Sequence, residues 1–212
     1  MFRHGFLLII FTILFQQGNS QLKEGTSIWY KYNDYYLSIT INGETKKLPA
    51  RYCRMVFTDS LSFTYRYGEE KKDPYKGQPV FNMTANGFGS YYYPAGHELN
   101  VFLRKKKKIY QVTDTVQRYK WELFDDQKIV AGFQCKSALT FRNQTDSVIA
   151  WYTTELPGSF SPGYFTGLPG VVLEIQDNYT GDRISAIKVE SLRLDIRLPE
   201  NAKVVSDFHH LK

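Results

Sequence analysis

Two glutamates, Glu155 and Glu174, are the side chains best placed for acid–base chemistry, because they flank a segment rich in proline and glycine at 151–175. A pair of carboxyl groups on either side of a sugar bond is what most glycoside hydrolases use. Glu174, however, alternates with Leu173 and Ile175, which predicts the outward face of a strand. We expect Glu155 to accept hydrogen bonds from backbone N–H groups of the loop. The pattern favours structural roles, and a secreted hydrolase is the weakest of the three hypotheses below.

The histidines add no recognisable active site. His4 lies in the N-terminal leader, His97 in a stretch rich in loop-forming residues, and His209–His210 in the C-terminal tail. The sequence contains no nucleophile elbow, zinc-protease helix, phosphate-binding loop or dinucleotide fingerprint. Scattered histidines and two distant cysteines lack the spacing of a metal site. The sequence predicts no catalytic residue, no metal site and no cofactor, and we expect that the protein is not an enzyme.

The two cysteines, Cys53 and Cys135, allow two interpretations. In an exported protein they could form a disulfide, and closing so long a loop would stabilise the fold by about 4 to 5 kcal/mol. Spacing alone does not show whether the two Cα atoms lie close enough for a bond. A disulfide and two separate buried thiols are equal alternatives at this stage.

The N-terminus has the layout of a secretory signal. Arg3 precedes an apolar run from Phe6 to Phe15, and small residues stand before a cleavage point at Gln21. The run is too short to cross a bilayer comfortably. We predict a signal peptide over 1–20 and one domain over 21–212, exported to the periplasm or extracellular space, soluble, and without a transmembrane segment.

Composition favours an all-β fold. The 212 residues include 16 Tyr and 15 Phe, which suit pleated surfaces. The net charge of +6 is mild, and the basic residues are spread along the chain, so nucleic acid is not an expected partner. Lys105–Lys108 is interpreted as an exposed turn or charged sheet edge.

Local patterns predict consecutive hairpins. Asn42–Gly43 is the strongest hairpin signal, and 68–100 is rich in loop-forming residues with room for one short helix. A turn is expected at 125–128 after a strand around Trp121. In the last strand, the apolar phase changes, which predicts a bulge near Glu190–Ser191. The tail from 199 to 212 is expected to be loosely held. Such a meander should curve into a barrel, a half-barrel or a sandwich, and we favour a strongly curved half-barrel with loops packed in its mouth.

The segment at 151–175 is predicted to be an ordered loop that packs on a sheet. Its prolines fix φ, its glycines permit conformations that a Cβ forbids, and its apolar residues are too many for a solvated linker. We expect at least one of Gly167 and Gly170 to need positive φ or a close backbone approach. The predicted structural motif comprises Trp151, Tyr152, Glu155, Pro157, Pro162, Gly163, Gly167, Leu168, Pro169 and Gly170.

These motif residues carry a resemblance to a known family. Gly167 to Val172 reads Gly-Leu-Pro-Gly-Val-Val and resembles the hexapeptide of the GLPGLI family of Bacteroidota envelope proteins. The flanking residues from Ala150 to Thr153 fit the same pattern, whereas Asn143 to Asp146 stand where a Gly-Arg pair is common. The resemblance covers about 121 to 187 and implies an envelope protein of largely unknown function. By analogy, the architecture resembles the LolA/RseB-like lipoprotein-carrier fold.

Three functional hypotheses follow. In the first, a concave apolar face binds a lipid, an acyl chain or a hydrophobic peptide without catalysis. In the second, the protein fills that face with its own Phe and Tyr side chains and acts as a structural or accessory partner of an outer-membrane protein. The third is the secreted hydrolase. An open cavity with an apolar lining would separate the first hypothesis from the second.

Overall fold

The computed structural model describes residues 22–34, 38–41, 44–47, 50–68, 73–82, 87–93, 98–105, 107–115, 119–142, 144–163 and 165–206. All regular secondary-structure elements in these ranges are β-strands, which confirms the all-β prediction. No helix forms in the described part of 68–100. The predicted signal peptide lies outside the described residues.

The described residues form fifteen strands. They are β1 (Lys23–Asp34), β2 (Ser38–Ile41), β3 (Glu44–Lys47), β4 (Tyr52–Phe57), β5 (Ser62–Tyr67), β6 (Val80–Phe81), β7 (Gly87–Tyr93), β8 (Glu98–Lys105), β9 (Lys108–Thr115), β10 (Glu122–Val130), β11 (Phe133–Phe141), β12 (Ser147–Thr153), β13 (Val171–Asp177), β14 (Asp182–Ile196) and β15 (Lys203–Val204). The two longest connections lie between β5 and β6 and between β12 and β13.

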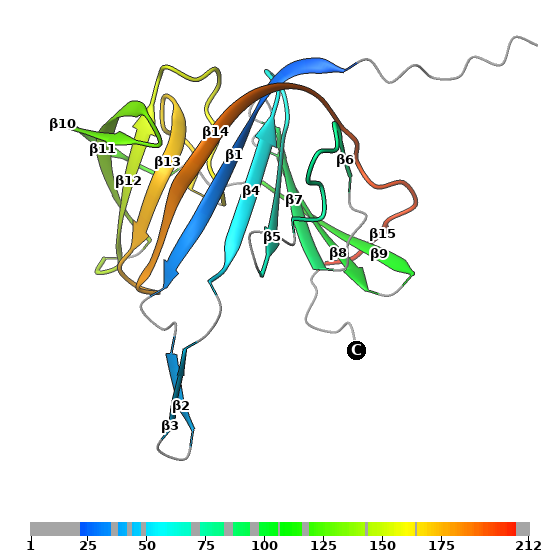
Figure 1. The fold of residues 1–212 in the computed structure, drawn as a ribbon, viewed down its shortest axis with the longest axis horizontal. Coiled ribbons are helices and arrows are strands. Elements are labelled where there is room, and N and C mark those ends of the chain that lie inside the picture. The colour runs from blue at the N-terminus through cyan, green and yellow to red at the C-terminus, as the bar shows by residue number, and fades with distance from the viewer. Residues whose placement is uncertain are drawn as a thin grey trace, which may run out of the picture.

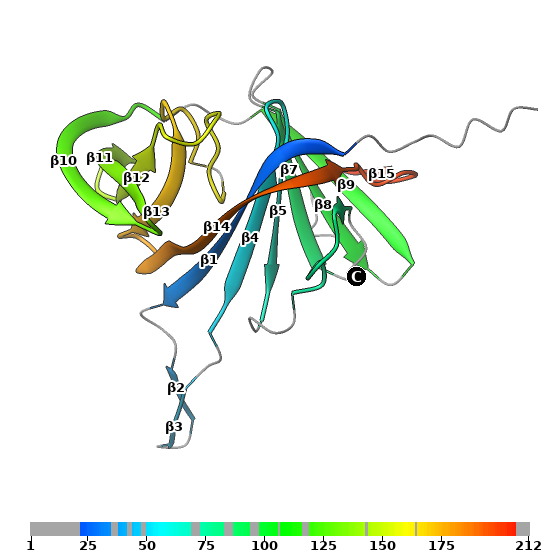
Figure 2. The same cartoon turned by 45° about the horizontal axis from the view of Figure 1, so that its top comes forward.

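Thirteen strands form one strongly curved sheet (Figure 1). Its order is β10-β11-β12-β13-β14-β1-β4-β5-β7-β8-β9-β15, with β6 added beside the end of β14. Strands β10 and β9, toward the two ends of the sheet, lie well apart, so the sheet stays open (Figure 2). This confirms the half-barrel form of the prediction. β2 and β3 form a separate hairpin whose pairing of Ile41 with Glu44 agrees with the turn expected between them.

The central pair of the sheet joins distant parts of the chain. β14 runs antiparallel to β1 from the pair Lys23 and Leu194 to the pair Asp34 and Asp182. The register shifts where Trp29 faces Lys188 and Tyr30 faces Ala186, so Ile187 is the extra residue. The predicted bulge therefore exists but lies at Ile187, not at Glu190–Ser191.

Apolar side chains cover both faces of the sheet. The concave face holds a cluster that draws on β1, β4, β8, β11, β13 and β14, including Ile28, Tyr30, Phe57, Leu99 and Leu173. The opposite face holds Val56, Phe63, Tyr91, Phe102 and Leu194 beneath β6. Leu194 therefore faces a second core, which explains much of the phase change that the sequence shows in β14.

Two further local predictions are wrong. The residues expected to turn at 125–128 continue β10, with an irregular register between Leu123 and Gln127, and the turn follows at Ala131–Gly132. Both turn residues have positive φ, 49° and 90°. The tail expected to be loose is attached in part, because Lys203 and Val204 pair in parallel with β9. Pairing with the neighbouring strand β11 extends β10 through the predicted turn, and long-range pairing with β9 holds the tail.

Candidate functional site

The loop between β12 and β13 is held by close backbone packing at its second end. A Cβ added at Gly170 would overlap the carbonyl oxygen of Thr153, closer than real Cβ atoms come. Gly167 has φ of 98° and more open surroundings, because a Cβ added there would lie 3.5 Å from its nearest neighbour, Tyr119 O. Both glycines therefore have a conformational or steric role of the expected kind. Leu168 between them is buried.

Hydrogen bonds fix the same loop to β13 and to Trp121, and a further bond ties β13 to β1. Tyr30 on β1 donates its hydroxyl to Val172 O at 2.7 Å, and Val172 N donates to Phe160 O at 2.8 Å. Trp121 Nε1 donates to Thr166 O at 2.9 Å. Phe160 packs on Phe57 of β4 with ring centroids 4.7 Å apart.

The loop spreads over both faces of the sheet. Leu156 and Phe160 belong to the concave cluster. Phe165 and Leu168 belong to a third cluster on β11, β12 and β13, which also contains Tyr152. The loop therefore clamps the ends of β12 and β13 from both sides.

A cleft of about 500 Å³ lies beside the tip of this loop on the concave face. Pro162 and Gly163 form one wall, and Leu99 and Val101 of β8 contribute apolar lining. Polar groups also line it, including Arg66 of β5. The concave face is thus filled by Phe160 and its neighbours at one end and open at the other.

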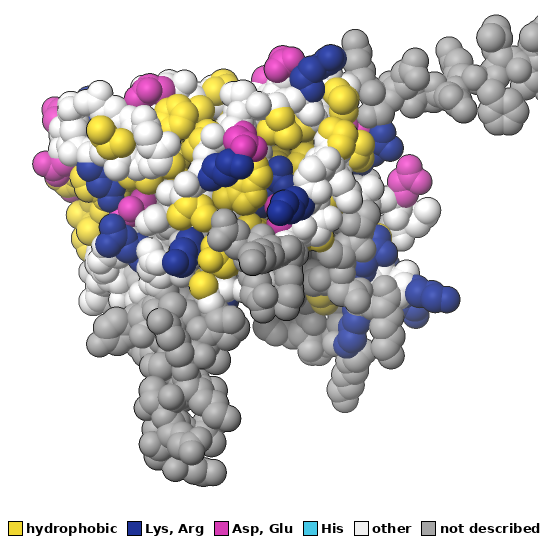
Figure 3. All heavy atoms as spheres, viewed as in Figure 1, with side chains coloured by type: hydrophobic (Ala, Val, Ile, Leu, Met, Phe, Trp, Pro, Cys, Tyr) yellow, Lys and Arg dark blue, Asp and Glu magenta, His cyan; other side chains and the backbone are white. Residues whose placement is uncertain are grey.

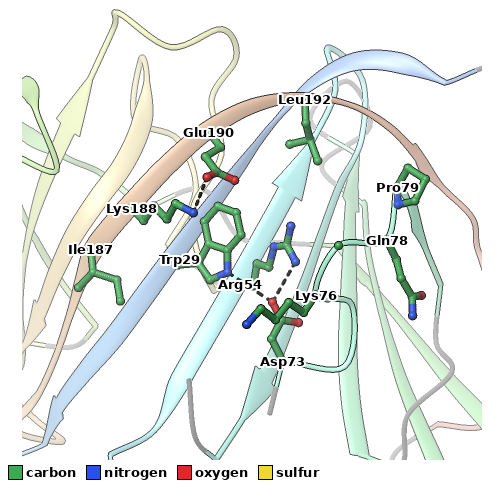
Figure 4. A pocket seen from close by; sticks show the side chains of 11 residues that line it. Trp29, Arg54, Asp73, Lys76, Gln78, Pro79, Ile187, Lys188, Glu190 and Leu192 are labelled. Atoms are coloured by element: carbon green, nitrogen blue, oxygen red, sulfur yellow. Dashed lines mark hydrogen bonds and ion pairs between the residues drawn. The ribbon is translucent and has the colours of Figure 1, made fainter. Parts of the chain in front are cut away.

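A second hollow, of about 620 Å³, lies on the opposite face. Figure 4 shows Trp29 and Arg54 on its floor, Lys188 and Glu190 on one side, and the segment with Gln78 and Pro79 on the other. Figure 3 shows basic side chains gathered around apolar ones on the face where β14 and β1 lie. We call this hollow the Trp29 pocket.

A buried ion pair forms the floor of the Trp29 pocket. Arg54 Nη1 lies 2.9 Å from Asp73 Oδ2, and both side chains are 4% exposed. Tyr65 donates its hydroxyl to Asp73 at 2.6 Å, and Trp29 Nε1 and Tyr75 N also donate to this carboxylate at 3.3 and 3.0 Å. Such saturation of a buried charge offsets its desolvation.

Arg54 is the positive centre of the pocket. Its Nε donates to Ser27 Oγ at 2.7 Å, and its guanidinium carbon lies 4.2 Å from the centre of the Trp29 ring. The second terminal nitrogen, Nη2, has no hydrogen bond to any described residue, although Arg54 as a whole is 3% exposed. Figure 4 shows this nitrogen directed toward the side of the pocket where Leu192 lies.

Glu155 and Glu174, at the two ends of the loop, have different environments. Glu174 is buried, which contradicts the predicted outward position. Lys128 donates to it at 2.6 Å, and Arg183 and Ser185 donate at 2.9 Å. Burial raises the pKa of Glu174, but these donors outweigh burial and lower the pKa below its ordinary value. Glu174 is buried because the side chains of Lys128, Arg183 and Ser185 cover its carboxylate.

Glu155 has the expected kind of partner in an unexpected place. It accepts the backbone N–H of Gln134 on β11 at 2.9 Å, not one from its own loop. The backbone N–H of Glu155 donates a hydrogen bond to Thr153 Oγ1 at 3.2 Å. Glu155 therefore links the loop to β11. The predicted loop residues Trp151, Tyr152, Pro157 and Pro169 lie in or beside the same clamp and do not converge on the cleft.

The two cysteines are free thiols, so the disulfide suggested as one alternative does not form in this structure. Both belong to the concave cluster, where Cys135 Sγ donates to Phe133 O at 3.6 Å. Burial raises the pKa of Cys53 to about 12 and that of Cys135 to about 11. A protonated thiol is a poor nucleophile, so the geometry gives them a packing role.

Clusters of metal ligands and membrane-spanning helices are both absent from the described ranges. No group of three His, Cys, Asp or Glu side chains there could hold a metal ion. Nor does any helix in that part of the chain have the length and apolar character to span a membrane.

Sequence reasoning missed the Trp29 pocket entirely. Arg54 was visible as a lone charge between Cys53 and Met55 in an apolar strand, which indicates a buried cation with a partner. Nothing local identifies that partner as Asp73, which lies in the loop-rich stretch at 68–100. The pocket arises from long-range pairing of β1, β4 and β14.

The fold and its two hollows define an all-β domain built on one open, curved sheet whose irregular segments shape the recesses on its faces. The chain belongs to the family described as N-glycanase peptide, N-terminal domain, whose model matches residues 97–208, more than half of the 212 residues. Among curated proteins, none matches the sequence.

Solved structures of PNGF-II are similar in fold. The form in space group C2 has a TM-score of 0.58 at 12% identity, and that in space group P21 has 0.60 at 13%. In each case the match covers 84% of this chain and 31% of the solved chain. The chain thus corresponds to about a third of these larger proteins, and at this identity the likeness shows the fold alone.

Proposed function

We propose that this protein is a non-catalytic binding domain that takes an apolar chain, such as an acyl chain or a hydrophobic peptide segment, into the concave cleft. The observation that carries the proposal is the open recess between β8 and the loop tip at Pro162–Gly163. Leu99 and Val101 supply apolar surface there, and burying such surface favours binding. A self-filled face alone would leave no recess of about 500 Å³.

The environment of the reactive groups supports a non-catalytic role. Glu174 and Asp73 are each held by at least three donors, and both thiols are buried. None of the described residues that line the cleft carries a carboxylate. General acid–base work needs a group free to exchange a proton with a substrate, and these groups are engaged in holding the fold.

Family membership supports an accessory role. The family is named for the N-terminal domain of an N-glycanase, and the similar PNGF-II structures are far longer than this chain. We propose export to the envelope or beyond, and a role beside other envelope proteins. The GLPGLI assignment and the likeness to lipoprotein carriers also stay proposals.

The test is native mass spectrometry of the protein expressed with export to the periplasm, followed by titration with cis-parinaric acid and with an apolar heptapeptide. We expect a bound or exchangeable apolar ligand at one site per chain. Release of sugar from a glycopeptide by the pure protein would contradict the non-catalytic proposal. Absence of binding for both probes would contradict the cleft assignment.

A further inference from the structure

The Trp29 pocket combines an aromatic surface with charged groups and lies on the face opposite the cleft. Trp29 and Ile187 give it apolar walls, and Arg54 and Lys76 give it cationic donors. Pro79 and Leu192 extend the apolar lining (Figure 4). At about 620 Å³ and open to one side, it has room for one or two sugar rings.

The charges of the pocket do not balance. Three cations, Arg54, Lys76 and Lys188, line it together with two carboxylates. Asp73 is bound by Arg54 and three further donors, and Glu190 pairs with Lys188. Lys76 has no ion pair with any residue that the structure describes. One positive charge is therefore left without a partner there.

Besides Lys76, Arg54 can donate hydrogen bonds to a ligand in the pocket. Arg54 Nη2 keeps its N–H groups unbonded among the described residues, although the Arg54 side chain is 96% buried. Its other two nitrogens are fixed by Ser27 and Asp73, so the free one is held in place. Because Nη2 is still reached by solvent in the pocket, an anionic oxygen can replace water there and accept a charge-assisted hydrogen bond.

The indole of Trp29 is also held in place. Its Nε1 donates to Asp73 at 3.3 Å, and Lys188 Nζ lies 4.8 Å from the ring centre. A fixed aromatic ring beside hydrogen-bond donors suits a ligand with one apolar face and polar edges. A simple acyl chain fits less well, because it would remove water from Lys76 and Arg54 without replacing their hydrogen bonds.

We propose that the Trp29 pocket binds a carbohydrate that carries a carboxylate. The carboxylate accepts hydrogen bonds from Arg54 Nη2 and Lys76, and the sugar ring packs against Trp29. Gln78, which also lines the pocket, is available to the hydroxyl groups. This site is separate from the concave cleft, so it stands or falls independently of the function proposed above.

The test follows the indole N–H resonance of Trp29 in the mature protein, one of three tryptophans, during titration with glucuronic acid and with glucose. We expect glucuronic acid to shift that resonance and to bind at least about tenfold more tightly than glucose. Lys76→Gln should weaken glucuronic acid binding by several fold to about tenfold. Lys107→Gln removes the same charge from a distant turn and should leave binding unchanged.

Three results would overturn the proposal. Glucuronic acid could leave the Trp29 resonance unmoved, or glucose could bind as tightly. Hexanoate could bind as tightly as glucuronic acid, which would show a carboxylate site without sugar recognition. Equal affinity of Lys76→Gln and the unmodified protein would also contradict it, since Lys76 is exposed and its loss should not disturb the fold.

Discussion

Two irregular segments cover the sheet, and they are stabilised in opposite ways. The loop at 154–170 packs with apolar side chains and close backbone contacts, and its hydrogen bonds are largely to the backbone. The segment at 73–82 covers the other face around the buried pair of Arg54 and Asp73. We expect the first to lose stability contact by contact and the second to depend on one charge that must stay paired.

Removing Asp73 gives the largest expected effect. Asp73→Ala leaves Arg54 buried without its counter-ion and also removes the acceptor of Tyr65 and Trp29. We expect a loss of about 3 to 5 kcal/mol in the free energy of unfolding, measured by denaturant titration. The exposed Asp59→Ala is the matched control and should change stability by less than about 0.5 kcal/mol. A small loss for Asp73→Ala would remove the contrast between the two segments.

Leu168 tests the apolar segment. Leu168→Ala removes a buried side chain from the cluster with Phe165 and should cost about 2 to 5 kcal/mol. Leu123→Ala, at a position 52% exposed, should cost little. Equal melting temperatures for the two variants would show that the loop does not clamp β12 and β13.

The glycines Gly170 and Gly167 separate steric from conformational constraint within that loop. Gly170→Ala should lower the free energy of unfolding by about 2 to 3 kcal/mol, because the new Cβ overlaps Thr153 O. Gly167→Ala should cost about 1 kcal/mol, through φ of 98° alone. The reverse order, measured by chemical denaturation, would contradict the close approach at Gly170.

The smallest expected effect is the pH dependence due to Glu174. Its folded pKa lies below the ordinary value, so its ion pairs stabilise the fold fully above the unfolded pKa, about 4.3. That contribution is lost as pH falls through the lowered folded pKa. Unfolding free energies between pH 6 and pH 2 should fall less steeply for Glu174→Gln than for the unmodified protein. Identical slopes would show that Lys128 and Arg183 do not stabilise the charged form.

Local sequence signals predicted the parts of the fold that depend on neighbouring residues. Alternation, tyrosine content and the Asn42–Gly43 signal gave the all-β meander, and the prolines of 151–175 identified a packed loop. The second core could not be predicted, because it forms where Leu194 of β14 meets Phe63 and Tyr91. The only local sign of the second core is the change of apolar phase in β14, which by itself indicates only a bulge.

The candidate functional sites could also be predicted only in part. Pro162 and Gly163 of the cleft were singled out for their backbone properties, and the structure places them on its wall. The Trp29 pocket was not predicted, since Arg54 and Asp73 are joined only through the fold. The position of the bulge at Ile187 was missed for a related reason: the apolar phase reports two cores and not one.

The central claim is that the loop tip shapes a cleft that binds an apolar chain, and a pair of glycine substitutions tests it most directly. A Cβ at Gly163 or at Gly68 would meet no atom within 4 Å, and only Gly163 lines the cleft. Both Gly163→Val and Gly68→Val should keep the melting temperature of the unmodified protein. We predict that Gly163→Val weakens binding of cis-parinaric acid by several fold while Gly68→Val does not, and equal affinity in both variants would contradict the claim.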